Sequence, residues 1–276
     1  MTLLSVEDDD TKGMTATMGP TVKSAEKTGL SATILKHTAI LLMFLNHFSE
    51  GMFRNGILDP AGWYRDFQWH LTRAAFILFA FLIAEGMAHT GSRRKYMLRL
   101  LGMGVASEFF YDELFYGGFP FWPVQNVFFT LFFGALAIAV IDRFRKKPYF
   151  AVPLAAVVLA ASSVVNGDYG LMGVAVILLF YYLRGKKLWM YLAVTAAIFV
   201  LWFVQCWIES LFSGEVFTLA KHLDGALLEL HGILAFPLIH FYDGRKGKQL
   251  TKEFYYLFYP GHLLLILMLV RLLPKC

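Results

Sequence analysis

Long apolar segments joined by short loops are the feature that most constrains what this chain can fold into. Segments of roughly 17–23 residues are long enough to cross a hydrocarbon core of about 30 Å as helices. A soluble domain of 276 residues has no core large enough to hide a chain that is 58% hydrophobic. We therefore predict an all-α fold, a polytopic transmembrane helical bundle of about nine spans. The predicted spans cover residues 32–53, 71–90, 95–115, 124–142, 148–165, 168–184, 187–208, 222–242 and 254–273.

Basic residues are distributed unevenly among the loops of this predicted bundle. Loops after the second, fourth, sixth and eighth spans are rich in Lys and Arg, whereas the intervening loops hold only Arg54, Arg65 and Lys221. Loops rich in Lys and Arg normally face the cytoplasm. We therefore expect a multi-pass protein of the cell membrane, surrounded by lipid, with a cytoplasmic N-terminus and an external C-terminus. The same loops account for the pI of about 9.1, and no nucleic-acid-binding module is recognisable.

The first 29 residues differ from the rest of the chain. They are polar, carry an acidic run at residues 7–10, and lack the basic start and apolar centre of a signal peptide. We expect them to form a disordered cytoplasmic tail. Residues 30–275 are expected to form a single transmembrane domain, because neither length nor composition suggests separate soluble domains.

Several predicted spans contain polar side chains that a passive membrane anchor does not need. A charged group at membrane depth costs several kcal/mol unless it is paired or solvated. The set therefore indicates a polar cavity, although interhelical hydrogen bonds and interface anchors are the alternative for each residue taken singly. An outer group, toward the external face, consists of Asn46, His47, Glu50, Arg73, Glu108, Asp112 and Asn126. An inner group, toward the cytoplasm, consists of Glu85, His89, Arg99, His240, Tyr242, Lys246, Tyr259 and His262.

The two groups suit different chemistry. Arg and Lys around the inner group favour an anionic ligand from the cytosol, because both bind phosphates well. The outer group has a histidine with carboxylates nearby along the chain, which suits general base catalysis. A proton-coupled transporter would also carry such residues, so the residues alone leave both functions open. No metal is expected, because Glu85 and His89 lack further ligands at a definable spacing and Cys206 and Cys276 have none.

A series of motifs occurs in a recognisable order along the chain. They are LKHTAILLMFLNHFSEGMF, TRAAFILFAFLIAEGMAHTGSRRKYMLRLL, ASEFFYD, NVFFTL, GDYG, LAFPLIHFYDGRKGK and YLFYPGHLLLI. Their order resembles the TraX family, which is named for a conjugation protein required to N-acetylate pilin. In two departures from the family pattern, Asn46 replaces the Asp before the first-span histidine and Ile77 replaces a Pro. Asn46 can orient His47 by hydrogen bonding but cannot stabilise an imidazolium by charge.

This resemblance implies an acetyltransferase of the bacterial inner membrane. Acetyl-CoA from the cytosol would be the acyl donor, and the acceptor would be an amine or hydroxyl of a pilin-like peptide or an envelope glycan. His47 would act as general base or take the acetyl group itself. Asn46 or Asn126 would stabilise the oxyanion, and Glu108 or Asp112 would orient His47 or bind the acceptor. The remaining expected contacts to donor or acceptor are Arg73, Glu85, His89, Arg93, Arg99, Tyr242, Lys246, Tyr259 and His262, with Asn126 again among them.

Alternatives to this hypothesis remain at two levels. A proton- or ion-coupled transporter is less well supported by an odd number of spans without an evident inverted repeat. A non-catalytic membrane scaffold would leave the histidine and carboxylates in the spans unexplained. At the level of residues, Glu85 and His89 are expected to line an entrance for the donor, but Glu85 could instead bond Arg99 or another helix. Tyr259 and His262 could simply shape and pack the last span.

Overall fold

The chain is helical throughout the part that the structure describes. The computed structural model describes residues 29–58, 63–214 and 216–274, and within these ranges it contains no β-strand. The predicted all-α class is therefore confirmed. The predicted cytoplasmic tail, residues 1–29, lies outside the described residues except for its last position.

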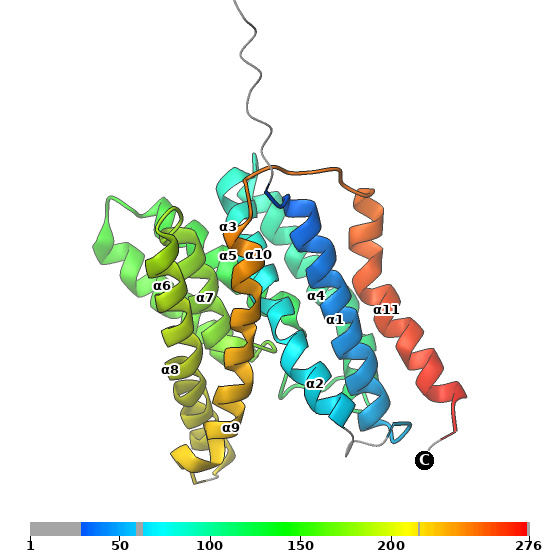
Figure 1. Cartoon of the computed structure of the whole chain (residues 1–276). Coiled ribbons are helices and arrows are strands. Elements are labelled where there is room, and N and C mark those ends of the chain that lie inside the picture. The colour runs from blue at the N-terminus through cyan, green and yellow to red at the C-terminus, as the bar shows by residue number, and fades with distance from the viewer. Residues whose placement is uncertain (1–28, 59–62, 215, 275–276) are drawn as a thin grey trace, which may run out of the picture.

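The helices cross one bundle in alternating directions, with α2 and α3 together making one crossing and α9, η1 and α10 another (Figure 1). In chain order they are α1 (Ala32–Arg54), α2 (Trp63–Thr72), α3 (Ala74–His89), α4 (Arg93–Phe115), α5 (Val127–Arg143), α6 (Pro148–Val165), α7 (Gly170–Tyr182), α8 (Lys187–Ser213), α9 (Leu219–Leu230), the 3₁₀ helix η1 (His231–Ala235), α10 (Phe236–His240) and α11 (Lys252–Leu272). Within the described ranges, five stretches are long and apolar enough to cross a membrane: Tyr64–His89, Pro148–Val165, Lys187–Leu211, Leu219–His240 and Glu253–Leu272. These helices identify a membrane protein.

Two predicted spans are interrupted helices in the structure. The predicted span 71–90 corresponds to α2 and α3, which begin at Trp63 and are separated at Arg73. The predicted span 222–242 corresponds to α9, η1 and α10, with the change to 3₁₀ geometry at His231. Pro237 lies in the first turn of α10, where its missing N–H removes no helical hydrogen bond. Each interruption lies beside polar residues, Arg73 in the first span and Glu229 and His231 in the second, within a segment predicted as one continuous helix.

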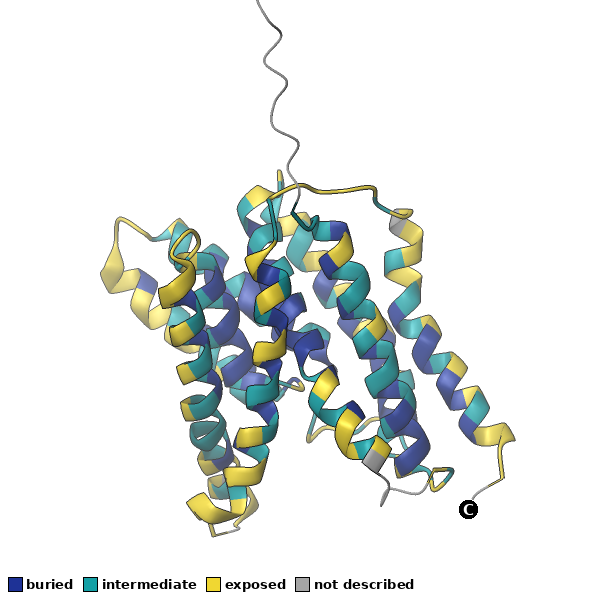
Figure 2. Ribbon diagram, in the orientation of Figure 1, coloured by how far each residue is buried: buried dark blue, intermediate teal, exposed yellow. Residues whose placement is uncertain are grey.

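Helix α3 occupies the centre of the bundle. It is apolar around its whole circumference, which is typical of a helix buried on all sides, and it packs against α1, α5, α7 and η1. Figure 2 shows buried residues concentrated in the middle of the bundle and exposed ones on α8 and α9. The exposed side chains of α6 and α11 include Val164 and Leu257, which are 82% and 68% exposed. Such outward apolar faces suit contact with lipid.

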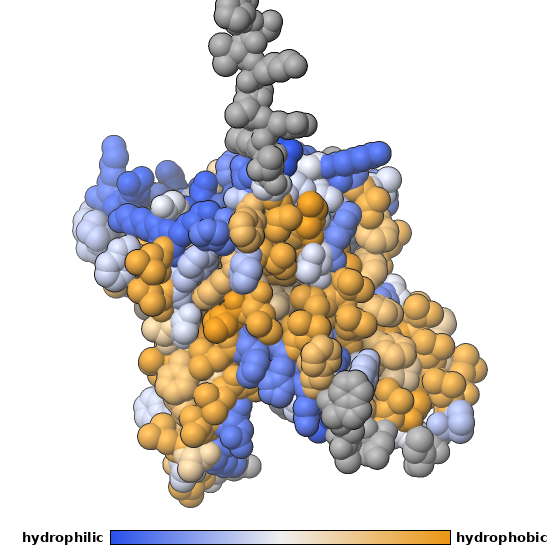
Figure 3. Space-filling view, viewed as in Figure 1, coloured by the Kyte–Doolittle hydropathy of each residue, from blue (hydrophilic) through white to orange (hydrophobic). Residues whose placement is uncertain are grey.

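One end of the bundle is strongly hydrophilic, and an apolar belt covers much of the rest of the visible face (Figure 3). The loops after α3, α5, α7 and α10 all lie at this end, which we call the basic end (Figure 1). The segment after α10 is tied there to the start of α1: the backbone N–H of Leu30 donates to the carbonyl of Phe241 at 2.8 Å, and that of Ala32 to the carbonyl of Arg245 at 2.8 Å. The loops predicted to share one side of the membrane therefore share one end of the bundle.

Candidate functional site

Two cavities of different chemistry lie within the bundle. The polar pocket, of about 160 Å³, is lined by Asn46, His47, Glu50, Arg54, Trp69, Arg73, Tyr111, Phe115, Tyr116, Asp168 and Tyr169. The apolar cavity, of about 220 Å³, is lined by Lys36, Ile40, Met43, Phe79, Leu82, Ile83, Tyr96, Arg99, Leu100, Met103, Val127, Phe128, Leu131, Tyr255, Tyr256, Phe258 and Tyr259. The apolar cavity includes the first turns of α4 and α11, so it lies toward the basic end.

A small third cavity of about 30 Å³ lies between these two. It shares Met43, Phe79 and Val127 with the apolar cavity. It shares four residues with the polar pocket: Asn46, His47, Asp168 and Tyr169. His47 therefore lies at the passage between an apolar and a polar compartment.

One face of α1 lines this entire path. Its lining residues recur every three or four positions, at Lys36, Ile40, Met43, His47, Glu50 and Arg54. Residues at this spacing stack along a single side of an α-helix. After the basic Lys36 at its start, the stripe is apolar at Ile40 and Met43 and polar from His47 onward, and this change sets the boundary between the two cavities.

His47 is held by a second histidine from the other end of the chain. The side chain of His47 is buried, and its Nδ1 lies 2.7 Å from Nε2 of His262 on α11. The second ring nitrogen of His262, Nδ1, lies 2.9 Å from the carbonyl oxygen of Phe258. The rings of Phe115 and Tyr259 meet His47 edge-on, with centroids 5.5 and 5.7 Å away. The hydroxyl of Tyr259 is buried without a hydrogen-bond partner among the described residues.

This contact corrects the predicted grouping by depth. Tyr259 and His262 were predicted in the inner group and His47 in the outer group, but the structure brings all three together. The prediction failed because the interior of the last span gives no local signal for the depth at which a given histidine meets its neighbour.

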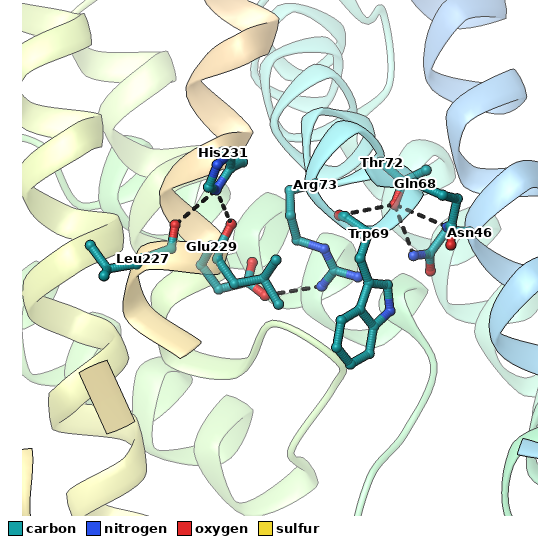
Figure 4. Close-up of polar contacts among 9 residues, drawn as sticks. Asn46, Gln68, Trp69, Thr72, Arg73, Leu227, Glu229 and His231 are labelled. Atoms are coloured by element: carbon teal, nitrogen blue, oxygen red, sulfur yellow. Dashed lines mark hydrogen bonds and ion pairs between the residues drawn. The ribbon is translucent and has the colours of Figure 1, made fainter. Parts of the chain in front are cut away.

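Asn46 faces a different neighbour from the adjacent histidine. Its side-chain amide donates to Oγ1 of Thr72 at 3.0 Å. The Thr72 hydroxyl also lies within 3.3 Å of the carbonyl oxygen of Trp69, at the end of α2 (Figure 4). Asn46 thus fastens α1 to the end of α2 while it still lines the polar pocket.

Arg73 bridges the two interrupted spans. Its guanidinium lies 3.0 Å from Glu229 on α9, and both side chains are largely buried (Figure 4). Arg73 lines the polar pocket as well, so a binding role remains open to it. Because each partner is adjacent to a helix break, the breaks bring the two charges together inside the bundle.

Glu108, Asp112 and Asn126 are engaged elsewhere. The carboxylate of Glu108 accepts hydrogen bonds from the side-chain amide and the backbone N–H of Asn126. The carboxylate of Asp112 accepts from the backbone N–H of Phe121 at 2.7 Å. None of the three is among the described residues that line the polar pocket. In this arrangement they hold the α4–α5 connection, and Asn126 also caps α5 by accepting from Phe128 N–H at 3.0 Å.

Glu85 is bonded to other helices at the basic end. Its carboxylate lies 2.9 Å from Arg184 and 3.8 Å from Nδ1 of His89, and it accepts a hydrogen bond from Tyr242 at 3.4 Å. The interface pair considered as an alternative is therefore present, with Arg184 in place of Arg99. This cluster joins the end of α3 to the loops after α7 and α10.

The basic residues at the same end differ in whether they have acidic partners. Arg93 lies 2.8 Å from Asp142 and 2.8 Å from the Tyr181 hydroxyl. Arg99 is exposed, lines the apolar cavity and has no ion pair with a described residue. Lys246 is exposed, and its carbonyl accepts from the hydroxyl of Thr33 at 2.8 Å. Of the predicted phosphate contacts, Arg99 and Lys246 are thus the more available.

Asp168 is a polar-pocket residue that the sequence analysis did not select. It belongs to the GDYG turn between α6 and α7, and its backbone N–H donates to the carbonyl of Gln125 at 2.9 Å. A Cβ at Gly167 would lie 2.6 Å from Oγ1 of Thr130, so only glycine allows this close approach. The GDYG motif was the sequence signal that could have identified this aspartate.

The fold and the site together define a class: helical membrane proteins with a buried histidine centre between two cavities. The sequence model described as TraX protein matches residues 31–271, and the chain belongs to the TraX family. Among curated proteins it is similar to the probable fimbrial assembly protein FimC, serogroup H1, of Dichelobacter nodosus. The two are 29% identical over 250 residues, which cover 86% of this chain and 94% of the relative. No solved structure matches the chain.

Proposed function

We propose that this protein is an integral membrane acyltransferase that moves an acetyl group from cytosolic acetyl-CoA to an amine on the other side of the membrane. The observation that carries the proposal is the position of His47 at the passage between the apolar cavity and the polar pocket. A residue that takes a proton from the acceptor and returns it to the leaving group must reach both the acceptor and the donor thioester. A histidine between two separate compartments meets that requirement when donor and acceptor enter from opposite ends.

The proposed orientation places the basic end in the cytoplasm. If α2–α3 and α9–α10 each count as one crossing, the helices would make about nine crossings, the number predicted from the sequence. Loops rich in Lys and Arg favour the cytoplasmic side. The apolar cavity would then open toward the cytosol and the polar pocket toward the exterior.

The donor would enter from the basic end. CoA carries several phosphate charges, and Arg94, Lys95 and Arg99 are exposed there without ion pairs to described residues. Exposed cations of this kind attract phosphates, each by a modest amount. The uncharged pantetheine arm and its thioester suit a cavity with apolar and aromatic walls. Tyr259, with its buried and unpaired hydroxyl, lies next to His47 and would donate a hydrogen bond to the thioester carbonyl.

The acceptor would occupy the polar pocket. The cations of the pocket already have acidic partners, with Arg54 bonded to Glu50 and Arg73 to Glu229. Asp168 is exposed to the pocket, and aromatic side chains such as Trp69 form part of the wall. A carboxylate with aromatic neighbours suits a cationic amine, which gains charge attraction and cation–π contact. A peptide amine is therefore the proposed acceptor, and the fimbrial name of the relative is consistent with it.

In the proposed reaction, the amine binds in the polar pocket as a cation and loses its extra proton to solvent before it attacks. Its nitrogen attacks the thioester carbonyl carbon while His47 takes a proton from the nitrogen. The carbon–sulfur bond then breaks, and the CoA sulfur leaves with the proton that His47 returns. His47 acts twice, as base and then as acid, and no acetylated histidine is needed.

The test is acetyl transfer by the full-length protein in lipid nanodiscs. Acetyl-labelled CoA is supplied with water, and then with a short peptide that has a free N-terminal amine. We expect thioester turnover with the wild type and with His222→Ala, since His222 lies on α9 outside both cavities. His47→Ala should lower turnover by about 10²-fold or more. Equal turnover in the His47→Ala variant would refute the assignment of the base.

One observation favours a second candidate, a proton- or ion-coupled transporter. The two cavities and the small one between them form a row through the bundle, as a transport path would. A transporter would move a solute across sealed vesicles without consuming acetyl-CoA. Solute flux that is independent of the donor, together with an absence of thioester turnover, would favour this second function.

A further inference from the structure

We propose that His262 is a positioning residue that holds His47 in the tautomer with its proton on Nδ1, which leaves the Nε2 lone pair open to the substrates. The inference gives His262 a role different from ligand binding. Its catalytic consequence rests on the proposed function, but the tautomer itself does not.

The chain of contacts fixes where each proton lies. A backbone carbonyl can only accept, so the contact between Phe258 and Nδ1 of His262 requires a proton on that nitrogen. A neutral imidazole carries one proton, so Nε2 of His262 has a lone pair and must accept. The contact at 2.7 Å with Nδ1 of His47 then requires the proton to be on Nδ1 of His47. Nε2 of His47 is consequently left without a proton.

The ring geometry agrees with this assignment. The planes of His47 and His262 differ by 8°, with centroids 5.1 Å apart. An imidazole N–H and an imidazole lone pair both lie in the ring plane, so a hydrogen bond between nearly coplanar rings is well aligned. Both side chains are buried, at 8% and 4% exposure, so water competes little for these nitrogens.

The other described neighbours of His47 do not form this kind of hydrogen bond with its ring. The residue before it, Asn46, turns its amide to Thr72. Phe115 and Tyr259 meet His47 through ring edges. Glu50 and Arg73 line the same pocket but are each bonded to a partner of opposite charge, and Asp168 forms no ion pair with His47. His262 therefore takes over the role of the aspartate expected at position 46. It orients His47 through a hydrogen bond but supplies no negative charge.

The consequence for catalysis concerns which nitrogen does the chemistry. In free histidine the proton prefers Nε2, the nitrogen that a base would need to keep open. Holding the proton on Nδ1 places the basic lone pair on the far side of the ring from His262. The same lone pair takes the acceptor's proton and returns it to the CoA sulfur, while the Nδ1–H bond to His262 persists through both transfers.

The test combines a spectrum with kinetics on the full-length protein in nanodiscs. Protein labelled with ¹⁵N-histidine is measured by NMR at a pH where the site is neutral, and His47 is assigned by comparison with His47→Ala. We expect the wild type to show His47 protonated on Nδ1. In His262→Ala we expect the signal to move to the Nε2–H form, and kcat to fall by about 10²-fold with the KM for acetyl-CoA unchanged.

Two further variants keep the result interpretable. His262→Gln retains an acceptor oxygen, so it should preserve part of the Nδ1–H form and part of the activity. This variant provides the test if His262→Ala fails to fold. His222→Ala should change neither the His47 spectrum nor kcat. A proton on Nε2 of His47 in the wild type would overturn the inference, as would an unchanged tautomer in His262→Ala. The Nδ1–H tautomer without any thioester turnover would support the inference and count against the acyltransferase proposal.

Discussion

The apolar cavity and the polar pocket share two helices, yet their walls differ in chemistry. Both are lined by α1 and α4; α3 continues from the apolar cavity into the small cavity, whereas α11 lines the apolar cavity. In the polar pocket, charges are paired across helices, as in Arg73 with Glu229. In the apolar cavity, Lys36 and Arg99 are the basic members of a wall that is otherwise apolar and aromatic.

The difference would allow one bundle to keep the two proposed substrates apart. A charged acceptor would lose hydration in the apolar cavity without finding a counter-charge. A long uncharged arm would gain little in the polar pocket. Under the proposed function, each compartment would reject the other substrate, and the reacting groups would meet at the passage beside His47.

Blocking the passage should have the largest effect. Val127 lines both the apolar cavity and the small cavity, so Val127→Phe would fill the space that joins the compartments. We expect acetyl transfer to fall by about 10²-fold, because reacting groups held about an ångström too far apart lose that much rate. Labelled acetyl transfer in nanodiscs measures the effect. Val164→Phe is the matched control, since Val164 is 82% exposed, and normal transfer by Val127→Phe would mean that the cavities do not form one path.

Breaking the buried ion pair should affect stability next. Glu229→Leu would leave Arg73 as an unpaired buried charge, and we expect the free energy of unfolding to fall by about 3 kcal/mol. Replacing both residues, as Arg73→Met with Glu229→Leu, should restore most of that loss because no charge remains uncompensated. Thermal unfolding in one detergent compares the three proteins. Equal destabilisation in the single and double variants would show that the charges act separately.

Asp168 should have a smaller effect that is confined to the acceptor. We expect Asp168→Asn to raise the KM for an amine-bearing peptide about fivefold, which corresponds to roughly 1 kcal/mol for a partly solvated charge pair. Hydrolysis of acetyl-CoA by water should not change, because the donor lies in the other cavity. Asp224→Asn on α9 serves as the control, since Asp224 lies outside both cavities. A change in donor hydrolysis with Asp168→Asn would place this residue in the reaction rather than in acceptor binding.

The sequence was sufficient to predict the helical membrane class and part of the site. The limits of α1 differ from the predicted span by a single residue, because the ends of a long apolar run indicate where the helix begins and ends. The selection of Asn46 and His47 followed from the cost of polar groups at membrane depth, and both line the polar pocket. Arg73 was selected for the same reason and also lines it.

Partners across the bundle could not be predicted in this way. His47 meets His262, which is 215 positions away, and Glu85 meets Arg184 in place of Arg99. Hydropathy indicates where a span begins and ends, but the depth at which a side chain meets its neighbour, the rotation of each helix and the identity of that neighbour come from packing. The same limit applies to Glu108, whose bonds to Asn126 hold a connection between helices rather than face His47.

The rim of the apolar cavity should give the smallest effect and the one most sensitive to salt. Arg99 is exposed beside that cavity without an ion pair to a described residue, so Arg99→Gln removes one attraction to the phosphates of CoA. We expect the KM for acetyl-CoA to rise about threefold at low salt and by less at high salt, because ions screen exposed charges. Arg145→Gln, another exposed arginine of the basic end, should leave the KM unchanged, since Arg145 lines neither cavity. If the acceptor KM changed in Arg99→Gln and the donor KM did not, the two compartments would have to exchange their proposed substrates.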